Sequence, residues 1–311
     1  MHGIESAKVK PTPETAISFV PIAGRWSVQP DHVTYVGPQE GDGVPVGICV
    51  TSVGLADGTV TVRVQGGGGG ESGRILLGYR SQGERYVMIG LGGHGFAYTI
   101  AELRPGIGWQ ALAYAGSGQS LMPDHWYGVR AETAGLGVRL FVDNVRVLEH
   151  VLKEQLVPGQ VGLFAWGEAS VRFAGLGITA RPQTVFVVMQ FSDQYSRVFG
   201  EIIRPVAAAF GLRAYHAGEI FGPGMILKDI VQGIADARVV VADITPANQN
   251  VFYELGYAHA LGKPVILLAE LGKDLPFDLR GYRVLFYETG DAGLRALEDG
   301  LRRHFEAIVH E

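Results

Sequence analysis

Residues 239–268 read VVVADITPANQNVFYELGYAHALGKPVILL, and this stretch decides the fold of the C-terminal part of the chain. The apolar, β-branched residues 239–242 predict a buried strand. A helix follows, with Asn250 predicted as its N-cap and Gly262 at its end. Residues 265–268 predict a second buried strand. A strand, a capped helix and a strand in this order are typical of an α/β fold with a parallel sheet.

A carboxylate, Glu254, lies about one turn into that helix, just after the chain leaves the carboxyl end of the first strand. Ligands of open α/β sheets bind at this edge. The functional interpretation therefore depends mainly on whether Glu254 acts on a substrate.

The bulk composition narrows the classes of protein and partner. The 311 residues predict two domains. A net charge of −5 and a pI near 6.0 give no electrostatic reason to expect nucleic acid or an anionic membrane as partner. The single cysteine, Cys49, excludes an internal disulfide framework and a cysteine-based zinc cluster. No apolar run approaches the ~20 residues of a membrane-spanning helix, and a single cysteine suits a reducing compartment. We therefore expect a cytoplasmic protein. We expect no bound metal, because the sequence shows no cluster of metal ligands.

The N-terminal part shows a strand pattern. Residues 1–16 are expected to form an irregular lead-in, and residues 17–180 contain short strand candidates separated by glycine turns. Within residues 59–65, valine alternates with polar side chains, and this period of two predicts an antiparallel sandwich or barrel. Asp143-Asn144 predicts a tight hairpin between two such strands.

Two phrases of this part, HWYGVRAETAGLGVRLFVDN and GQVGLFAWGEASVRFAGLGI, resemble the jelly-roll sandwiches of the concanavalin-like class, which includes laminin-G and legume-lectin-like domains. The resemblance implies a recognition or assembly domain whose ligand could be a glycan or a protein. Trp109, Trp126 and Trp166 either line a sugar site or pack in the core, and packing is the favoured alternative.

After a boundary at residues 181–183, strands and helices alternate to the end of the chain. This pattern predicts, over residues 184–311, a flavodoxin-like α/β domain with a parallel sheet of about five strands and right-handed crossovers. The strands are expected at 184–189, 212–216, 239–242, 265–268 and 283–287, and further helices at 195–210, 225–237 and 292–309. Pro205 should kink or split the first of these helices.

The loops after the strands gather at one edge of such a sheet and predict a pocket there. It is expected to contain carboxylates and amides, but neither a metal cluster nor a phosphate loop. The candidate residues, apart from Glu254, are Gln190, Phe191, Ser192, Asp193, Glu219, Asp243, Asn248, Asn250 and Tyr253.

Over roughly residues 184–309 the chain resembles the TIR-like and nucleoside 2-deoxyribosyltransferase-like group. The resemblance lies in VFVVMQFSDQYSRVFGEIIRPVAAAFGL, ADITPANQNVFYELGYAHALGKPVILL and LPFDLRGYRVLFY. It implies cleavage of an N-glycosidic bond in NAD, a nucleoside or a nucleotide, with Glu254 as the essential glutamate. Gln190 stands where related sequences often have proline, and Gly218-Glu219 where an Asp-Glu pair is common. These departures bear on the substrate more than on the fold.

The expected chemistry passes through an oxocarbenium-like state that a carboxylate can attack or stabilise. The dipole of the helix favours the ionised form of Glu254, and Asn250 could hydrogen-bond the ribose hydroxyls. Nicotinamide leaves NAD without a strong acid. A nucleoside base needs a proton donor, and Asp193, Glu219 or Asp243 could supply the proton.

The first hypothesis is therefore a TIR-like NAD hydrolase, with NAD as substrate and no cofactor. By resemblance it would be a bacterial immune effector that self-associates and is activated by assembly or by its N-terminal domain. A second hypothesis is a nucleoside or nucleotide 2-deoxyribosyltransferase or N-glycosidase. A third is a non-enzymatic nucleotide-binding or scaffold module.

Overall fold

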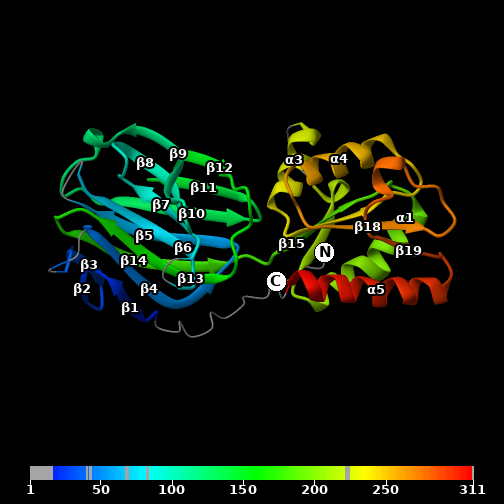
Figure 1. The fold of residues 1–311 in the computed structure, drawn as a ribbon, viewed down its shortest axis with the longest axis horizontal. Coiled ribbons are helices and arrows are strands. Elements are labelled where there is room, and N and C mark those ends of the chain that lie inside the picture. Colours follow the sequence, from blue (N-terminus) through cyan, green and yellow to red (C-terminus); the bar gives the residue numbers. More distant parts are fainter. Residues whose placement is uncertain are drawn as a thin grey trace, which may run out of the picture.

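The computed structural model describes residues 17–39, 41, 44–66, 70–81, 84–220 and 225–309. The irregular lead-in predicted for residues 1–16 lies outside them. A β-sandwich and an α/β unit lie side by side, and the chain passes from one to the other between β14 (Val171–Ala180) and β15 (Thr184–Val188) (Figure 1). None of the helices in the described ranges is long and apolar enough to cross a membrane.

The sandwich consists of two seven-stranded antiparallel sheets, which confirms the predicted jelly-roll sandwich. The first has the order β1-β4-β13-β6-β7-β8-β9 and the second β12-β11-β10-β5-β14-β3-β2. The bounds of the strands besides β14 are Phe19–Ala23 (β1), Arg25–Val28 (β2), His32–Gly37 (β3), Val46–Leu55 (β4), Gly58–Gln65 (β5), Ser72–Tyr79 (β6), Tyr86–Leu91 (β7), Phe96–Arg104 (β8), Gly108–Ser117 (β9), Tyr127–Ala134 (β10), Gly137–Val142 (β11), Val145–Val151 (β12) and Gly159–Trp166 (β13). The short strands β1, β2 and β3 were not predicted.

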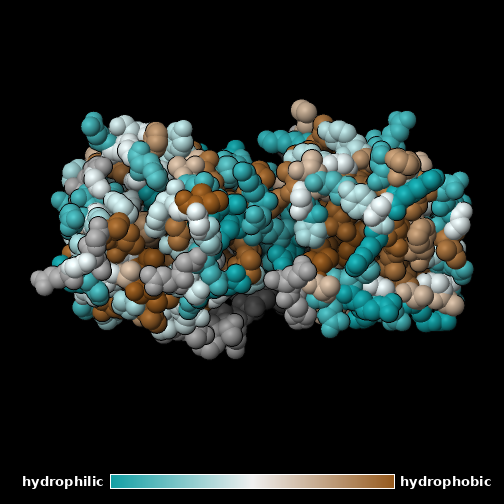
Figure 2. Space-filling view, in the orientation of Figure 1, coloured by the Kyte–Doolittle hydropathy of each residue, from teal (hydrophilic) through white to brown (hydrophobic). Residues whose placement is uncertain are grey.

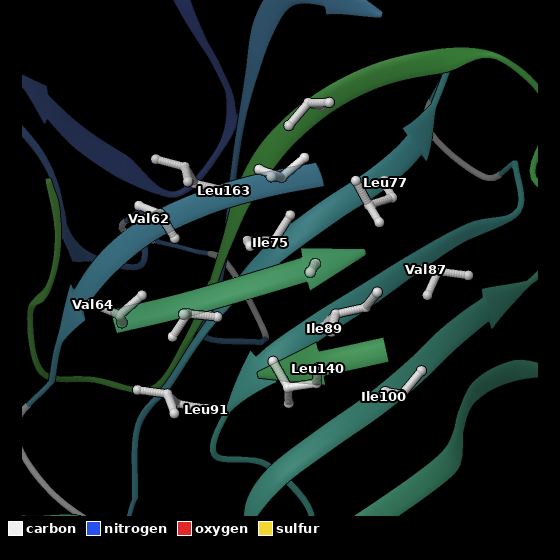
Figure 3. Close-up of a cluster of buried hydrophobic side chains, with 14 of the residues drawn as sticks. Val62, Val64, Ile75, Leu77, Val87, Ile89, Leu91, Ile100, Leu140 and Leu163 are labelled. Carbon is white, nitrogen blue, oxygen red and sulfur yellow. The ribbon is translucent and has the colours of Figure 1, made fainter. Parts of the chain in front are cut away.

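The core of the sandwich lies between the two sheets. Val60, Val62 and Val64 of β5 point inward and are buried, as their alternation predicts. They meet aliphatic side chains of the facing sheet, such as Ile75 and Ile89 (Figure 3). Burial of these branched side chains from both sheets is the main stabilising contribution to the sandwich.

The hairpin between β11 and β12 turns at Asp143-Asn144, as predicted. Both residues have positive φ, 49° and 67°, and Val142 pairs with Val145 across the turn. A two-residue turn of this kind needs left-handed backbone at both positions, which aspartate and asparagine tolerate better than most residues.

The α/β unit has a five-stranded parallel sheet in the order β16-β15-β17-β18-β19, which confirms the flavodoxin-like prediction. Hydrophobic clusters lie on both faces of the sheet, as expected for parallel strands. The remaining strands are Arg213–His216 (β16), Val239–Asp243 (β17), Val265–Glu270 (β18) and Val284–Tyr287 (β19). The helices are Asp193–Val198 (α1), Arg204–Ala209 (α2), Ile226–Asp236 (α3), Gln249–Ala260 (α4) and Asp291–Val309 (α5).

The helical segment before β16 is irregular where Pro205 was predicted to split it. A π-helical segment, Phe199–Ile203, joins α1 to α2, and Pro205 lies in the first turn of α2. Proline has no N–H to donate to the preceding turn, and the wider π turn accommodates this loss while the helix continues.

The sandwich contacts the C-terminal end of α3, and this contact links the two units. The amide of Leu136 donates to the carbonyl of Ala235 at 3.0 Å, and Arg139 pairs with Asp236 at 3.2 Å. Gln155 donates to the carbonyls of Ala237, at 3.3 Å, and Arg238, at 2.9 Å. The last carbonyls of a helix have no partner inside it. Here the sandwich supplies partners, so it helps to fix where α3 lies.

We expect Gly135→Ala to weaken this contact. Gly135 has φ +54°, and a Cβ there would lie 2.6–2.7 Å from the carbonyl oxygens of Ala235, Asp236 and Ala237. Left-handed strain and these collisions together should lower the free energy of unfolding by about 2–4 kcal/mol. The control is Gly175→Ala, because Gly175 has φ +64° with nothing within 4 Å of the added Cβ. Denaturant unfolding should show a clearly smaller loss for the control, and equal losses would contradict the role given to the contact.

Candidate active site

A cavity of about 570 Å³ lies at the carboxyl edge of the parallel sheet, between the end of β15, the loop after β16, and helices α3 and α4. Val187, Met189, Ala217, Ile220, Ile230 and Val251 form its apolar part. Its polar side chains are Asp229, Asn248, Asn250, Tyr253 and Glu254. An apolar pocket with a few polar groups is the usual form of a small-molecule site.

Helix α4 brings the asparagines and the glutamate to this cavity. Its N-cap is Asn248, not Asn250 as predicted, because the Asn248 side chain accepts hydrogen bonds from the amides of Asn250, at 2.9 Å, and Val251, at 3.4 Å. Helix α4 thus begins at Gln249, two residues earlier than the prediction implied, and Asn250 belongs to its first turn. The Asn250 side chain is therefore not used as a cap.

Glu254 is half-buried in the cavity wall. Burial raises the pKa of its carboxyl to about 7. The helix dipole was expected to favour the ionised form, but desolvation outweighs it at this position. A glutamate with a pKa near neutrality exchanges its proton readily and, once ionised, is poorly solvated. Both properties suit a carboxylate that reacts with, or stabilises, a developing cation.

The candidate residues from the sequence separate into two groups. Phe191, Asn248, Asn250, Tyr253 and Glu254 line the cavity. The other group does not line it, and its members are Gln190, Ser192, Asp193, Glu219 and Asp243.

The residues outside the cavity have other partners or positions. Gln190 lies next to the lining, since its side-chain oxygen accepts from the Asn248 amide at 3.3 Å. Ser192 is the N-cap residue of α1, and Asp193 is an exposed residue in its first turn. Glu219 forms an ion pair with Arg204.

Asp243 is buried at the end of β17, with only 2% of its surface exposed. It accepts hydrogen bonds from the hydroxyl of Tyr287 at 2.6 Å and from the amide and hydroxyl of Thr245 at 3.1 and 3.0 Å. Burial raises the pKa of its carboxyl to about 6, against the lowering effect of these hydrogen bonds. The geometry makes Asp243 a support for the loop and for β19, remote from solvent.

Helix α3 contributes side chains that were not among the candidates. Asp229 lines the cavity beside Ile226, Leu227 and Ile230. The sequence predicted a helix at 225–237, yet this prediction did not show that Asp229 would face the site. Only the position of α3 over the sheet edge brings Asp229 there.

The three tryptophans of the sandwich show mixed environments. Trp109 is 38% exposed and packs against Phe164 and Tyr86, with ring centroids 5.2 and 6.1 Å apart. Trp126 lies beneath the guanidinium groups of Arg63 and Arg172, at 5.3 and 5.5 Å. Trp166 is 37% exposed. None of these three side chains lines the cavity at the edge of the parallel sheet.

The described residues thus combine a jelly-roll sandwich with a flavodoxin-like α/β unit. The α/β unit has a carboxylate in a cavity at the edge of its sheet. No known protein-family profile matches the chain. The 5-hydroxymethyl-dUMP N-hydrolase of Rattus norvegicus is 31% identical over 121 residues, which cover 36% of this chain and 71% of that protein. The chain belongs to the family of this N-hydrolase.

Solved structures resemble the chain in its two parts. The carbohydrate-binding module CBM66 from Bacillus subtilis has a TM-score of 0.43 at 14% identity, covering 51% of this chain and 92% of that one. A β-glucanase from Bacillus licheniformis has a TM-score of 0.39 at 10% identity, covering 55% and 95%. The CMP N-glycosidase BcmB of Clostridium botulinum has a TM-score of 0.32 at 18% identity, covering 38% and 99%.

Proposed function

We propose that this protein hydrolyses the N-glycosidic bond of a nucleoside or nucleotide, with Glu254 as the central catalytic residue. The observation that carries the proposal is a half-buried glutamate with a raised pKa in a cavity at the sheet edge. Membership of the family of an N-hydrolase supports the same reaction.

The reaction assigns distinct roles to the side chains of the cavity. The bond between C1′ and the base nitrogen breaks, and its electron pair leaves with the base. Positive charge develops at C1′, where the Glu254 carboxylate attacks or stabilises it. Water then supplies the hydroxyl at C1′, breaks any bond formed there with Glu254, and gives its other proton to the carboxylate that has protonated the base. The side-chain amide of Asn250, which the helix does not use as a cap and which lines the cavity, would bind a hydroxyl of the sugar.

The departing base needs a proton, and Asp229 is the proposed donor. The sequence suggested Asp193, Glu219 and Asp243 for this role, but none of the three lines the cavity. Asp229 does, from the opposite helix to Glu254. Two carboxylates on facing elements can divide the roles of acid and of nucleophile, as in glycoside hydrolysis.

NAD hydrolysis is the second candidate, and one feature of the cavity favours it. Nicotinamide leaves NAD as a neutral molecule and requires no proton, so Glu254, which lines the cavity, would suffice without a proton donor. If the protein hydrolyses NAD, we also expect it to be a TIR-like enzyme that is activated by self-association and acts as an immune effector.

A substrate panel distinguishes the two candidates. The protein is incubated with NAD, NADP, nucleosides and nucleotides, and the products are identified by chromatography and mass spectrometry. Release of free base from a nucleoside or nucleotide, with NAD intact, is the expected result. Release of nicotinamide alone would select the second candidate. No product with any substrate would contradict both and leave a binding or scaffold module.

The pH dependence follows from the raised pKa of Glu254. Because the carboxylate is the working form of Glu254 and its pKa is about 7, the acid side of the kcat/KM profile should rise with pH up to about 7. One unit below the pKa the ionised fraction is about a tenth, so kcat/KM should fall roughly tenfold per pH unit there. Initial rates between pH 5 and 8.5 measure this. A profile flat down to pH 5 would contradict the raised pKa.

A further inference from the structure

The charges around the cavity are negative. The only charged side chains among the described residues that line it are Asp229 and Glu254, and none is lysine or arginine. Proteins usually bind phosphate through arginine, lysine or free backbone amides, and the first two are missing from the described lining.

Two of the backbone amides at the start of α4 are also engaged. A helix N-terminus is a ready anion site because its first amides have no partner inside the helix. Here the Asn248 side-chain oxygen accepts from the amides of Asn250 and Val251, at 2.9 and 3.4 Å. A phosphate would have to displace this cap before it could use those amides.

Arg204, whose partner Glu219 follows the lining residue Gly218, is already paired. It forms an ion pair with Glu219, and its guanidinium lies 4.4 Å from the centre of the Phe199 ring. This pair leaves little net positive charge on that side of the cavity.

The rim of the cavity is apolar and aromatic. Phe191, Ile226, Leu227 and Tyr253 line it and remain 58%, 73%, 45% and 57% exposed. Hydrophobic surface is common on both parts of the molecule (Figure 2), but these four side chains gather at one opening. Aromatic and aliphatic surfaces suit a flat, uncharged base and sugar.

We propose that this site takes nucleosides in preference to their 5′-phosphates. A phosphate carries close to two negative charges and would meet the two acidic side chains of the lining, with no lining lysine or arginine to compensate. This proposal rests on the proposed function and narrows its substrate class. It also separates this chain from its relative, whose name specifies a nucleoside monophosphate.

Binding and turnover are measured on matched pairs. Titration calorimetry with Glu254→Gln, which should bind without cleaving and keeps the acidic Asp229 and a lining without lysine or arginine, compares 2′-deoxyuridine, 5-hydroxymethyl-2′-deoxyuridine, cytidine and adenosine with their 5′-monophosphates. At least one nucleoside should bind tenfold or more tightly than its monophosphate. Monophosphates that bind as well as or better than their nucleosides, or no binding of any nucleoside, would overturn the proposal. Wild-type protein with the same pairs tests hydrolysis separately, so a site that binds nucleosides without cleaving them would contradict only the proposed function.

A charge variant tests the electrostatic cause. Ile226→Arg places a cation at the rim, where Ile226 is 73% exposed. It should raise the affinity for the monophosphate relative to the nucleoside at least fivefold, and added salt should reduce this gain. Ile226→Gln is the matched control and should leave the ratio within twofold of the parent. An unchanged ratio in Ile226→Arg would contradict the assignment of the preference to charge.

Discussion

Glu254→Gln should lower kcat for base release by about a thousandfold or more while the protein stays folded. Glutamine cannot attack C1′ and carries no charge to stabilise an oxocarbenium-like state, and loss of a group of this kind typically costs several orders of magnitude. Initial rates on the best substrate of the panel measure the effect. Glu219→Gln is the matched control, since Glu219 pairs with Arg204 outside the cavity lining. It should change kcat less than threefold.

Glu254→Gln should be more stable than the wild-type protein above neutral pH. The folded-state pKa of Glu254, about 7, exceeds the value of 4.5 for an unperturbed glutamate. The folded state therefore binds the proton more tightly, and the wild-type protein loses stability as pH rises from about 4.5 through 7. Glutamine avoids this loss. Thermal unfolding should show Glu254→Gln more stable than wild type at pH 8 and the difference much reduced at pH 4.5. Equal or lower stability at pH 8 would contradict the burial of the charge.

Asp243→Asn should lower stability with little effect on turnover by the folded protein. The carboxylate accepts three hydrogen bonds, from the hydroxyl of Tyr287 and from the amide and hydroxyl of Thr245. The amide nitrogen of asparagine cannot accept, so at least one buried donor loses its partner. Such a loss costs about 2–3 kcal/mol in the free energy of unfolding.

Denaturant unfolding and active-site-normalised rates separate the two possible roles of Asp243. Tyr287→Phe removes the other partner of the shortest bond, and the double variant should lose less stability than the sum of the two single losses. A hundredfold fall in kcat for Asp243→Asn with unchanged stability would instead place Asp243 in the chemistry.

The fold could be predicted from the sequence to a large extent because its hydrophobic periodicity is strong. Alternation in β5 and continuous apolar runs such as residues 239–242 define the two kinds of sheet. Strands β1 and β2 were missed because they have only five and four residues, and β1 contains Pro21, which is atypical of a strand. The pairings of β1 with β4 and of β3 with β14 join residues far apart in the chain, which local pattern does not reveal.

The site could be predicted only in part because it depends on side-chain direction and on the packing of distant elements. The sequence placed Glu254 on α4, but local pattern gives neither its burial nor the rise of its pKa. Two asparagines, Asn248 and Asn250, were both plausible caps, and only the backbone shows which side chain bonds the amides. Asp229 was missed because the position of α3 depends partly on contacts with the sandwich, beginning with Leu136.

Hydrolysis in ¹⁸O-labelled water tests the central claim most directly. The best substrate of the panel is incubated with wild-type protein and with Glu254→Gln, and base and sugar are analysed by mass spectrometry. Hydrolysis at the N-glycosidic bond predicts unlabelled free base, one ¹⁸O in the sugar at C1′, and at most a trace of either product with Glu254→Gln. Base release that Glu254→Gln sustains at the wild-type rate, or ¹⁸O in the base or a phosphate instead of the sugar, would contradict the claim.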